Sequence, residues 1–361
     1  MTRKKKVAIL YGGRSVEHAV SVNSGRNIVE HLNKDLYEAL PIGISKSGQW
    51  FLTSSVHREI EKGEPLGIIL NSDKPAFIKL ESGTRFMADI VFPVLHGTDG
   101  EDGSIQGLIK TLDLPMVGTS VLGSSLAMNK IMAKHLLRAA GLPVTDFLTF
   151  RFDEKDKISF NAIAKKLGLP FMIKSASLGS SVGVTKVKDA KDFKLAVAEA
   201  FKYDDEMLAE EFIEGREIEC AILGNYPPEA SHPGEIIISK KYEFYTFDAK
   251  YVDPNAVQIN VPAVLPKATM EKIRKVSKKA FEALHGQDFA RIDLFLDKKG
   301  NIFINEINTI PGFTNSSMYP MMWGERGVSF SDLITRLLNL GLERYNRSKR
   351  IERDFQSALK F

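Results

Sequence analysis

Apolar and polar positions alternate most clearly in two neighbouring stretches toward the C-terminal end of the chain. Residues 289–296 and 302–308 are rich in β-branched and aromatic side chains, and the segment Asp297-Lys298-Lys299-Gly300-Asn301 separates them. Two such runs joined by a short polar segment with glycine predict a β-hairpin.

Four polar side chains lie on this hairpin at positions that can share one face. Side chains alternate between the faces of a strand, so Arg291 and Asp293 point the same way, as do Glu306 and Asn308. Two carboxylates and a carboxamide on rigid strands suit Mg²⁺, which fills its remaining positions with water and substrate phosphates. Ordinary ion pairs on a solvated sheet face give the same pattern. The hairpin alone therefore leaves both interpretations open.

The chain opens with a short apolar strand that ends in a glycine turn. The strand is predicted at residues 7–11, the turn is Gly12-Gly13-Arg14-Ser15, and a helix is predicted from Val16 to about Leu32. Strand, turn and helix in this order begin an α/β unit, in which ligands gather at the C-terminal ends of strands. Glu17, in the first turn of the helix, either complements the helix dipole or holds a substrate ammonium.

A second α/β region follows a helix that is predicted from Ser124 to Ala140 and that carries Lys130. The strand 171–174 ends in Lys174 and continues into a loop rich in glycine and hydroxyl side chains. This is not a Walker loop, because the lysine precedes the glycines. Successive backbone N–H groups in such a loop can still cover phosphates. A plain glycine hairpin is the alternative.

Two later segments suggest a nucleotide and a lid. The predicted strand 206–213 ends beside acidic residues, an arrangement in which backbone groups can bind an adenine edge and a carboxylate can bind ribose. Residues 240–262 form a long, aromatic and irregular segment, and loops of this length in compact enzymes are usually lids.

Composition narrows the class of protein. A chain of 361 residues with 43% hydrophobic and 26% charged residues predicts two or three globular domains. The formal net charge of +4 comes with no long basic tract, so nucleic-acid binding is not indicated. No apolar run is long enough to span a membrane, and the basic start does not resemble a secretory signal. The single cysteine, Cys220, lies in an apolar run and is predicted to be a buried packing residue. A cytoplasmic enzyme is expected.

Taken in order, these stretches resemble ATP-grasp enzymes and, among them, the D-alanine–D-alanine ligase family. Each motif alone is weak, whereas their order is specific and extends over nearly the whole chain. The segments that carry the resemblance are residues 12–18, 96–103, Lys174 with 179–183, 210–213, 250–251, 291–293 and 305–314.

The resemblance implies a mixed α/β fold with a three-domain ATP-grasp architecture. An N-terminal α/β sheet domain that binds substrate is expected at 1–125, and a central ATP-grasp subdomain at 126–217. A C-terminal ATP-grasp domain, with the metal site and the lid loop 240–262, is expected at 218–361. ATP would lie between the last two.

The resemblance also assigns roles to matched positions. The implied ATP-binding residues are Lys130, Lys174, Ser180, Ser181, Glu210, Glu211, Phe212, Ile213, Glu217 and Lys250. The implied ligands of two Mg²⁺ ions, for which Mn²⁺ can substitute, are Asp293, Glu306 and Asn308. The implied substrate-binding residues are Glu17, His96, Arg291 and Ser317. The implied catalytic residues are Glu17, Ser180, Lys250, Tyr251, Arg291 and Gly312.

The implied activity is ATP-dependent ligation of two D-alanines through a D-alanyl phosphate, with release of ADP and phosphate, for peptidoglycan precursor synthesis. A homodimer is implied, without nucleic acid or membrane as partners. Three alternatives stay open: a D-alanine–D-lactate ligase, a non-catalytic ATP-binding regulatory relative, and a more distant ATP-grasp enzyme with another carboxylate substrate. Tyr251 favours an amine acceptor over D-lactate. Ser175 and Thr246-Phe247 depart from the usual family pattern in the phosphate loop and the lid.

Overall fold

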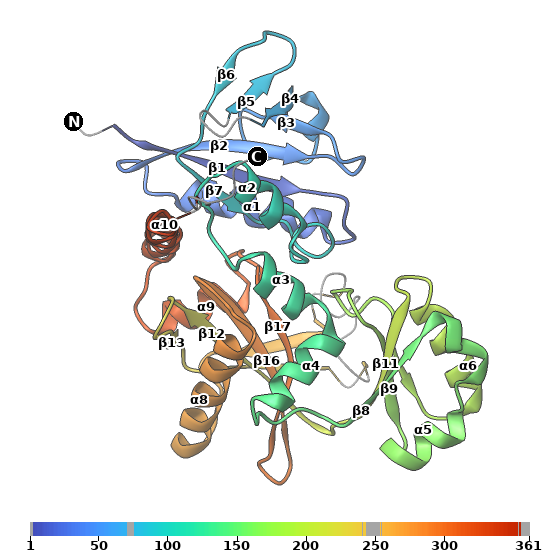
Figure 1. Cartoon of the computed structure of the whole chain (residues 1–361). Coiled ribbons are helices and arrows are strands. Elements are labelled where there is room, and N and C mark those ends of the chain that lie inside the picture. Colours follow the sequence, from blue (N-terminus) through green and yellow to red (C-terminus); the bar gives the residue numbers. More distant parts are fainter. Residues whose placement is uncertain are drawn as a thin grey trace, which may run out of the picture.

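The computed structural model describes residues 3–70, 76–239, 241–242, 253, 255–352 and 354. These residues form three β-sheets that follow one another along the chain. Figure 1 shows the N-terminal sheet at the top, the C-terminal sheet below it and the central sheet to the right. The predicted mixed α/β class is confirmed, whereas the domain limits at 125 and 217 stay predictions.

The N-terminal sheet has seven strands in the order β6-β5-β4-β3-β2-β1-β7. Strands β1, β2 and β7 pair in parallel, and the others extend the sheet in antiparallel fashion. The strands are β1 (Lys5–Gly12), β2 (Tyr37–Ile44), β3 (Trp50–Leu52), β4 (Glu64–Ile69), β5 (Ala76–Lys79), β6 (Arg85–Phe86) and β7 (Ile90–Pro93). The helices of this region are α1 (His18–His31), η1 (Ile60–Lys62) and α2 (Ser104–Thr111).

Strand β1 is buried on both faces, as expected for a central parallel strand. Val7, Ile9 and Tyr11 belong to a cluster that includes residues of α1 and of the last helix, α10 (Phe330–Ser348). Ala8 and Leu10 belong to a second cluster, which includes residues of α2. Helices therefore cover both faces of this sheet. The glycine turn follows directly at the C-terminal end of β1.

The central sheet has four strands in the order β10-β9-β11-β8, all antiparallel. Its core is apolar and includes side chains from α5 and α6. Its elements are β8 (Phe147–Arg151), η2 (Phe152–Lys157), α5 (Phe160–Leu167), β9 (Phe171–Ser175), β10 (Val184–Val187), α6 (Ala190–Ala200) and β11 (Glu206–Glu211).

The C-terminal sheet has six strands in the order β15-β14-β12-β16-β17, with β13 paired to β12. The predicted hairpin forms its β16 and β17. Cys220 is fully buried on β12, as predicted. The elements of this region are β12 (Gly215–Leu223), β13 (Glu229–Ala230), β14 (Gly234–Ile238), β15 (Val257–Asn260), α8 (Lys267–Ala283), β16 (Phe289–Asp297), β17 (Ile302–Asn308) and α9 (Met318–Glu325).

The continuous helix predicted from Ser124 to Ala140 is wrong. The segment forms two helices, α3 (Val121–Met128) and α4 (Lys130–Ala139), with Asn129 in an extended conformation between them. Asn129 Oδ1 accepts a hydrogen bond from the Met132 N–H at 2.9 Å and so caps α4. The Lys130 N–H is diverted to the Ala176 carbonyl at 2.8 Å. A contact with the central sheet thus overrides the helical pattern and places Lys130 at the start of α4.

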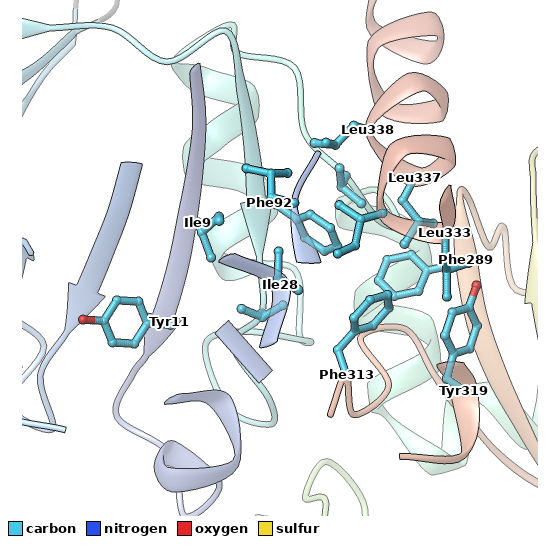
Figure 2. Close-up of a cluster of buried hydrophobic side chains, with 14 of the residues drawn as sticks. Ile9, Tyr11, Ile28, Phe92, Phe289, Phe313, Tyr319, Leu333, Leu337 and Leu338 are labelled. Atoms are coloured by element: carbon cyan, nitrogen blue, oxygen red, sulfur yellow. The ribbon is translucent and has the colours of Figure 1, made fainter. Parts of the chain in front are cut away.

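An aromatic core joins the two ends of the chain. Figure 2 shows Phe289, Phe313 and Tyr319 packed together beside leucines of α10 and Phe92 of β7. Arg344 of α10 adds polar bonds to the same joint: it pairs with the fully buried Asp288 and donates to two backbone carbonyls in the segment that follows α2. This joint fixes the N-terminal sheet relative to the hairpin.

Among the residues described, no helix is both long and apolar enough to cross a membrane.

Candidate active site

The polar face of the predicted hairpin is present in the structure. Arg291 lies opposite Asn308, and Asp293 lies opposite Glu306. Arg291 Nε and Nη2 each donate to one oxygen of Asp293 at 2.7 Å. Asn308 Nδ2 donates to Asp293 Oδ2 at 3.0 Å. These side chains are half-buried and joined by charge-assisted bonds, which distinguishes this face from a fully solvated sheet surface.

A β-bulge next to Asp293 brings one more residue into the candidate site. Sequence reasoning does not predict this contact. The register shifts between Asp293 and Leu294, so that Asn305 is the extra residue of β17. Asn305 Oδ1 accepts a hydrogen bond from Lys174 Nζ of the central sheet at 3.1 Å. The bulge therefore links the hairpin to the strand that leads into the glycine-rich loop.

Two cavities meet at the hairpin face. The larger cavity has a volume of about 630 Å³ and the smaller one about 410 Å³. Asp293 lines the smaller cavity, whereas Arg291 and Asn308 line the larger one. The residues that line both are Glu219, Ile236 and Glu306. The hairpin thus forms part of a common wall.

The smaller cavity lies between the central and C-terminal sheets. It brings together every residue of the predicted ATP-binding set that the structure describes, apart from Ser180, which lines the larger cavity. The residues gathered there are Lys130, Lys174, Ser181, Glu210, Glu211, Phe212, Ile213 and Glu217.

A buried group of one carboxylate and two lysines lies at the wall of this cavity. Glu210 Oε1 lies 2.7 Å from Lys134 Nζ, and Glu210 Oε2 lies 2.7 Å from Lys174 Nζ. Burial would raise the pKa of Glu210, but the two ammonium groups lower it below its usual range, so the carboxylate is ionised. Burial lowers the pKa of Lys134, and the Glu210 carboxylate opposes that shift. Lys130 and Lys174 line the cavity, and lysine side chains at this wall suit a phosphate. Sequence reasoning misses Lys134, because helix lysines are ordinarily solvated and Glu210 is distant in the sequence.

The glycine-rich loop between β9 and β10 is held by hydrogen bonds to residues outside the loop. Lys130 Nζ donates to the Leu178 carbonyl at 2.5 Å, and the Ser177 N–H donates to Asp204 Oδ2 at 2.7 Å. Ser180 and Ser181 have φ values of 56° and 60°, in the left-handed region. Two successive non-glycine residues in this region require such support, and strained loops of this kind are common at ligand sites.

Glu17 is buried at the N-cap of α1, after the glycine turn, and faces the same loop. Its carboxylate accepts a short hydrogen bond from Ser180 Oγ. A Cβ atom on Gly97 would lie 2.6 Å from Glu17 Oε2, and one on Gly179 would lie 3.0 Å from it. Glycine at both positions therefore lets two loops close around the carboxylate. Glu17 and Ser180 both line the larger cavity.

His96 also lines the larger cavity, but both of its ring nitrogens are engaged within the protein. Nδ1 lies 2.8 Å from the Ile310 carbonyl, and Nε2 lies 2.9 Å from Ser24 Oγ. Burial lowers the pKa of His96, so the ring is neutral. A carbonyl only accepts, so Nδ1 donates to Ile310 and Nε2 accepts from Ser24. The predicted contact of His96 with substrate stays a prediction.

Glu101 holds the loop after β17 against the N-terminal region. One of its oxygens accepts from the Gly97 N–H and the other from the Ile310 N–H, each at 2.9 Å. Enclosure at the cavity wall, aided by the charge of Glu17, raises the pKa of Glu101 to about 8. The sequence places Glu101 in a polar loop without indicating this role, because Ile310 is distant in the chain.

Gly312 and Ser317 line the far side of the larger cavity. Ser317 Oγ accepts from the Thr314 N–H at 3.0 Å and lies 2.8 Å from Thr314 Oγ1. A Cβ atom on Gly312 would lie 2.9 Å from Ser317 Oγ, so glycine permits this close turn. Lys250 and Tyr251, predicted as catalytic residues on the lid, lie outside the described residues, as does most of the lid segment.

The donor set of the hairpin fits a hard divalent cation. Asp293, Glu306 and Asn308 offer carboxylate and carboxamide oxygens, the ligands that Mg²⁺ prefers when phosphates complete its shell. Within the described part of the chain, no group of three or more His, Cys, Asp and Glu side chains is spaced to hold a metal ion by itself. With two carboxylates and one carboxamide, the set fits a metal ion that takes its further oxygen ligands from water or phosphate.

The three-sheet fold, with a lysine-lined cavity between two sheets and a second cavity that holds a buried acid, places the chain in the class of ATP-grasp enzymes. Comparison with known proteins specifies the family. The chain matches the family models described as "D-ala D-ala ligase N-terminus" over residues 6–119 and "D-ala D-ala ligase C-terminus" over residues 136–339. The chain belongs to the D-alanine–D-alanine ligase family.

Individual relatives agree with this assignment. The D-alanine–D-alanine ligase of Shouchella clausii is 43% identical, over 97% of this chain and 98% of that protein. The solved structure of the Coxiella burnetii D-alanine–D-alanine ligase has a TM-score of 0.85 at 35% identity, over 96% of this chain and 98% of that one. The VanG D-Ala:D-Ser ligase of Enterococcus faecalis has a TM-score of 0.84 at 33% identity, over 94% of this chain and 100% of that one. The predicted family and ATP-grasp fold are confirmed.

Proposed function

We propose that this chain joins two D-alanine molecules to form D-alanyl-D-alanine, with conversion of ATP to ADP and phosphate, for peptidoglycan precursor synthesis. The observation that carries the proposal is the common wall of the two cavities. There the hairpin face lies between two lysines of the smaller cavity, Lys130 and Lys174, called here the phosphate-side lysines, and the buried acid Glu17. Family membership supports D-alanine rather than D-lactate as the acceptor, and an enzyme rather than a regulatory relative.

The first step activates a carboxylate, which is a poor acyl donor by itself. A carboxylate oxygen of the first D-alanine attacks the γ-phosphorus of ATP, the bond to the β-phosphate oxygen breaks, and D-alanyl phosphate and ADP result. Lys130 and Lys174 neutralise the phosphate oxygens, while Glu17 binds the ammonium of the first D-alanine. Asp293, Glu306 and Asn308 would hold two Mg²⁺ ions, or Mn²⁺ in their place, which supply further positive charge when bound.

The second step forms the amide bond. The free amine of the second D-alanine attacks the acyl carbon, and phosphate leaves with the bonding electrons of the acyl–oxygen bond. The nitrogen loses one proton as the amide forms, and the departing phosphate accepts it. Negative charge develops on the carbonyl oxygen, and Arg291 and the Gly312 N–H stabilise it. Ser317 binds the carboxylate of the second D-alanine.

Water must be excluded while the acyl phosphate exists, since water would hydrolyse it. We assign this task to the lid of residues 240–262, with Lys250 at the transferred phosphate and Tyr251 linked to Ser180 and Glu17. We further propose a homodimer in the cytoplasm. Light scattering of the purified chain tests the dimer, and a mass equal to one chain would contradict it.

Product analysis tests the proposed function. We expect ADP release to depend on D-alanine, and mass spectrometry to identify D-alanyl-D-alanine as the product. L-alanine serves as the control and should support no turnover. A mixture of D-alanine with D-lactate or D-serine near neutral pH tests the acceptor. ADP release without dependence on D-alanine, or a mixed product in excess over the dipeptide, would contradict the proposal.

A further inference from the structure

One buried carboxylate at the common wall has no role in the site proposed so far. Glu219 lies on β12, directly opposite Asp293 of β16. Its side chain is 5% exposed, and it lines both cavities. Its Oε2 lies 2.9 Å from Nε of Arg291. Burial of a carboxylate is unfavourable unless a positive group offsets it, and here Arg291 is that group.

Arg291 lies between two carboxylates on adjacent positions of the sheet. Its Nε is 2.9 Å from Glu219 Oε2 and 2.7 Å from Asp293 Oδ1. Its Nη2 donates to the second oxygen of Asp293 at 2.7 Å. The strand ladder fixes the backbone of both acids, so the guanidinium is positioned from two sides. In the proposed reaction these two acids have unequal duties.

In the proposed reaction Asp293 would share its oxygens with bound cations. Oxygen lone pairs directed at Mg²⁺ would be less available to the guanidinium, so the hydrogen bonds that Arg291 donates to Asp293 would weaken. The proposed metal ligands do not include Glu219. Its carboxylate, in a side chain that is 5% exposed, lies 2.9 Å from the Arg291 Nε. Its ion pair with Arg291 would therefore persist while Asp293 binds cations.

We propose that Glu219 is a positioning residue, which holds the Arg291 guanidinium at the boundary of the two cavities while Asp293 binds metal. This inference rests on the proposed function, because it takes Asp293 as a metal ligand and Arg291 as the oxyanion donor. Glu219 also balances one positive charge in a wall that would hold two divalent ions. Outer partners of this kind typically change activity or metal affinity about 10–100-fold when they are removed.

A double-mutant cycle tests the inference. The variants are Glu219→Gln, Arg291→Ala and the double variant, with Glu64→Gln as a control that removes a carboxylate from a lysine pair in the N-terminal sheet. For each, kcat is measured with D-alanine and ATP, and the Kd of ADP and of Mn²⁺ is measured by calorimetry without turnover. Melting temperatures show whether each variant folds.

We expect Glu219→Gln to lower kcat about tenfold, with the Kd values of ADP and Mn²⁺ within about twofold of the unmodified protein. In the Arg291→Ala background the same change should lower kcat less than about twofold further, because its target is absent. Glu64→Gln should leave kcat unchanged. If Glu219→Gln fails to fold, Glu219→Asp, which keeps the charge but shortens its reach, should reproduce the kcat loss in the first background alone.

Three results would overturn the inference. Equal losses of kcat in both backgrounds would show that Glu219 acts independently of Arg291. A loss of Mn²⁺ affinity as large as that of Asp293→Asn would make Glu219 a metal ligand. Unchanged turnover in Arg291→Ala would remove the role of Arg291 itself. Failure of the proposed function would give a different result, because the unmodified protein would then show no turnover that depends on D-alanine.

Discussion

Asp293 and Arg291 form one ion pair, yet we expect their replacements to fail differently. Asp293→Asn should weaken Mg²⁺-dependent ATP binding about tenfold, because the proposed metal site loses a carboxylate. Arg291→Ala should lower kcat about 100-fold with ATP affinity nearly unchanged, because an oxyanion donor acts mainly in the transition state. Calorimetric titration of ATP analogues and steady-state rates distinguish the two. Equal losses of ATP affinity would contradict this division of roles.

Glu101 gives the protein a pH-dependent stability with a defined sign. Its pKa is about 8 in the folded protein, against an ordinary value of 4.5. Between these values the folded chain binds more protons at this position than the unfolded chain, so stability falls as pH rises from about 4.5 to about 8. The expected loss is about 1–2 kcal/mol, less than the full linkage, because the cavity wall is accessible to water.

Thermal melting of Glu101→Gln alongside the unmodified protein measures this effect. The variant lacks the titrating group. The difference in melting temperature, variant minus unmodified protein, should therefore increase as pH rises from 5.5 to 8.5. Groups elsewhere titrate equally in both proteins and cancel from the difference. A difference that is constant over this range would show that Glu101 is ionised throughout.

At the scale of elements, the break between α3 and α4 supports the phosphate-side lysines. Asn129→Ala removes the cap of α4 and the bond from Asn129 Nδ2 to Ser177 Oγ. We expect a loss of about 1 kcal/mol in stability and a weaker affinity for ATP, since Ser177 begins the glycine-rich loop. Ser159→Ala, which removes the cap of α5, is the matched control. It should lower the melting temperature similarly and leave ATP affinity intact.

The elements show what the sequence can predict and where it stops. The hairpin face can be predicted from the sequence, because alternation along a strand fixes which side chains share a face. The contact of Asn305 cannot be predicted in this way, because a bulge depends on the pairing register of two strands. Lys134 was hidden for a related reason: its partner Glu210 belongs to another sheet. The break at Asn129 follows from a contact with Ala176, which a helical pattern of apolar residues does not encode.

At the scale of the whole molecule, the joint between Arg344 and Asp288 holds the first and last parts of the chain together. Burial raises the pKa of Asp288, and Arg344 opposes that shift. Arg344→Met should lower the free energy of unfolding by about 3–5 kcal/mol, because it leaves a buried carboxylate without its partner. Denaturant unfolding measures this loss.

Two controls make this prediction specific to the joint. Arg347→Met removes an exposed arginine from the same helix and should change stability by less than about 0.5 kcal/mol. Asp288→Asn added to Arg344→Met should recover part of the loss, because no buried charge remains. The loss in Arg344→Met should also grow as pH rises, since the unpaired Asp288 must then ionise. Equal effects of Arg344→Met and Arg347→Met would contradict the prediction.

The position of α10 has a consequence for synthesis of the chain on the ribosome. Strand β1 emerges first, but residues of α10 complete the apolar cluster around Val7, Ile9 and Tyr11. At ordinary rates of translation, the interval between β7 and α10 is on the order of ten seconds or more. During that interval one face of the first sheet exposes apolar side chains, which makes the nascent chain prone to aggregation. The N-terminal sheet is therefore fully covered only after α10 has emerged.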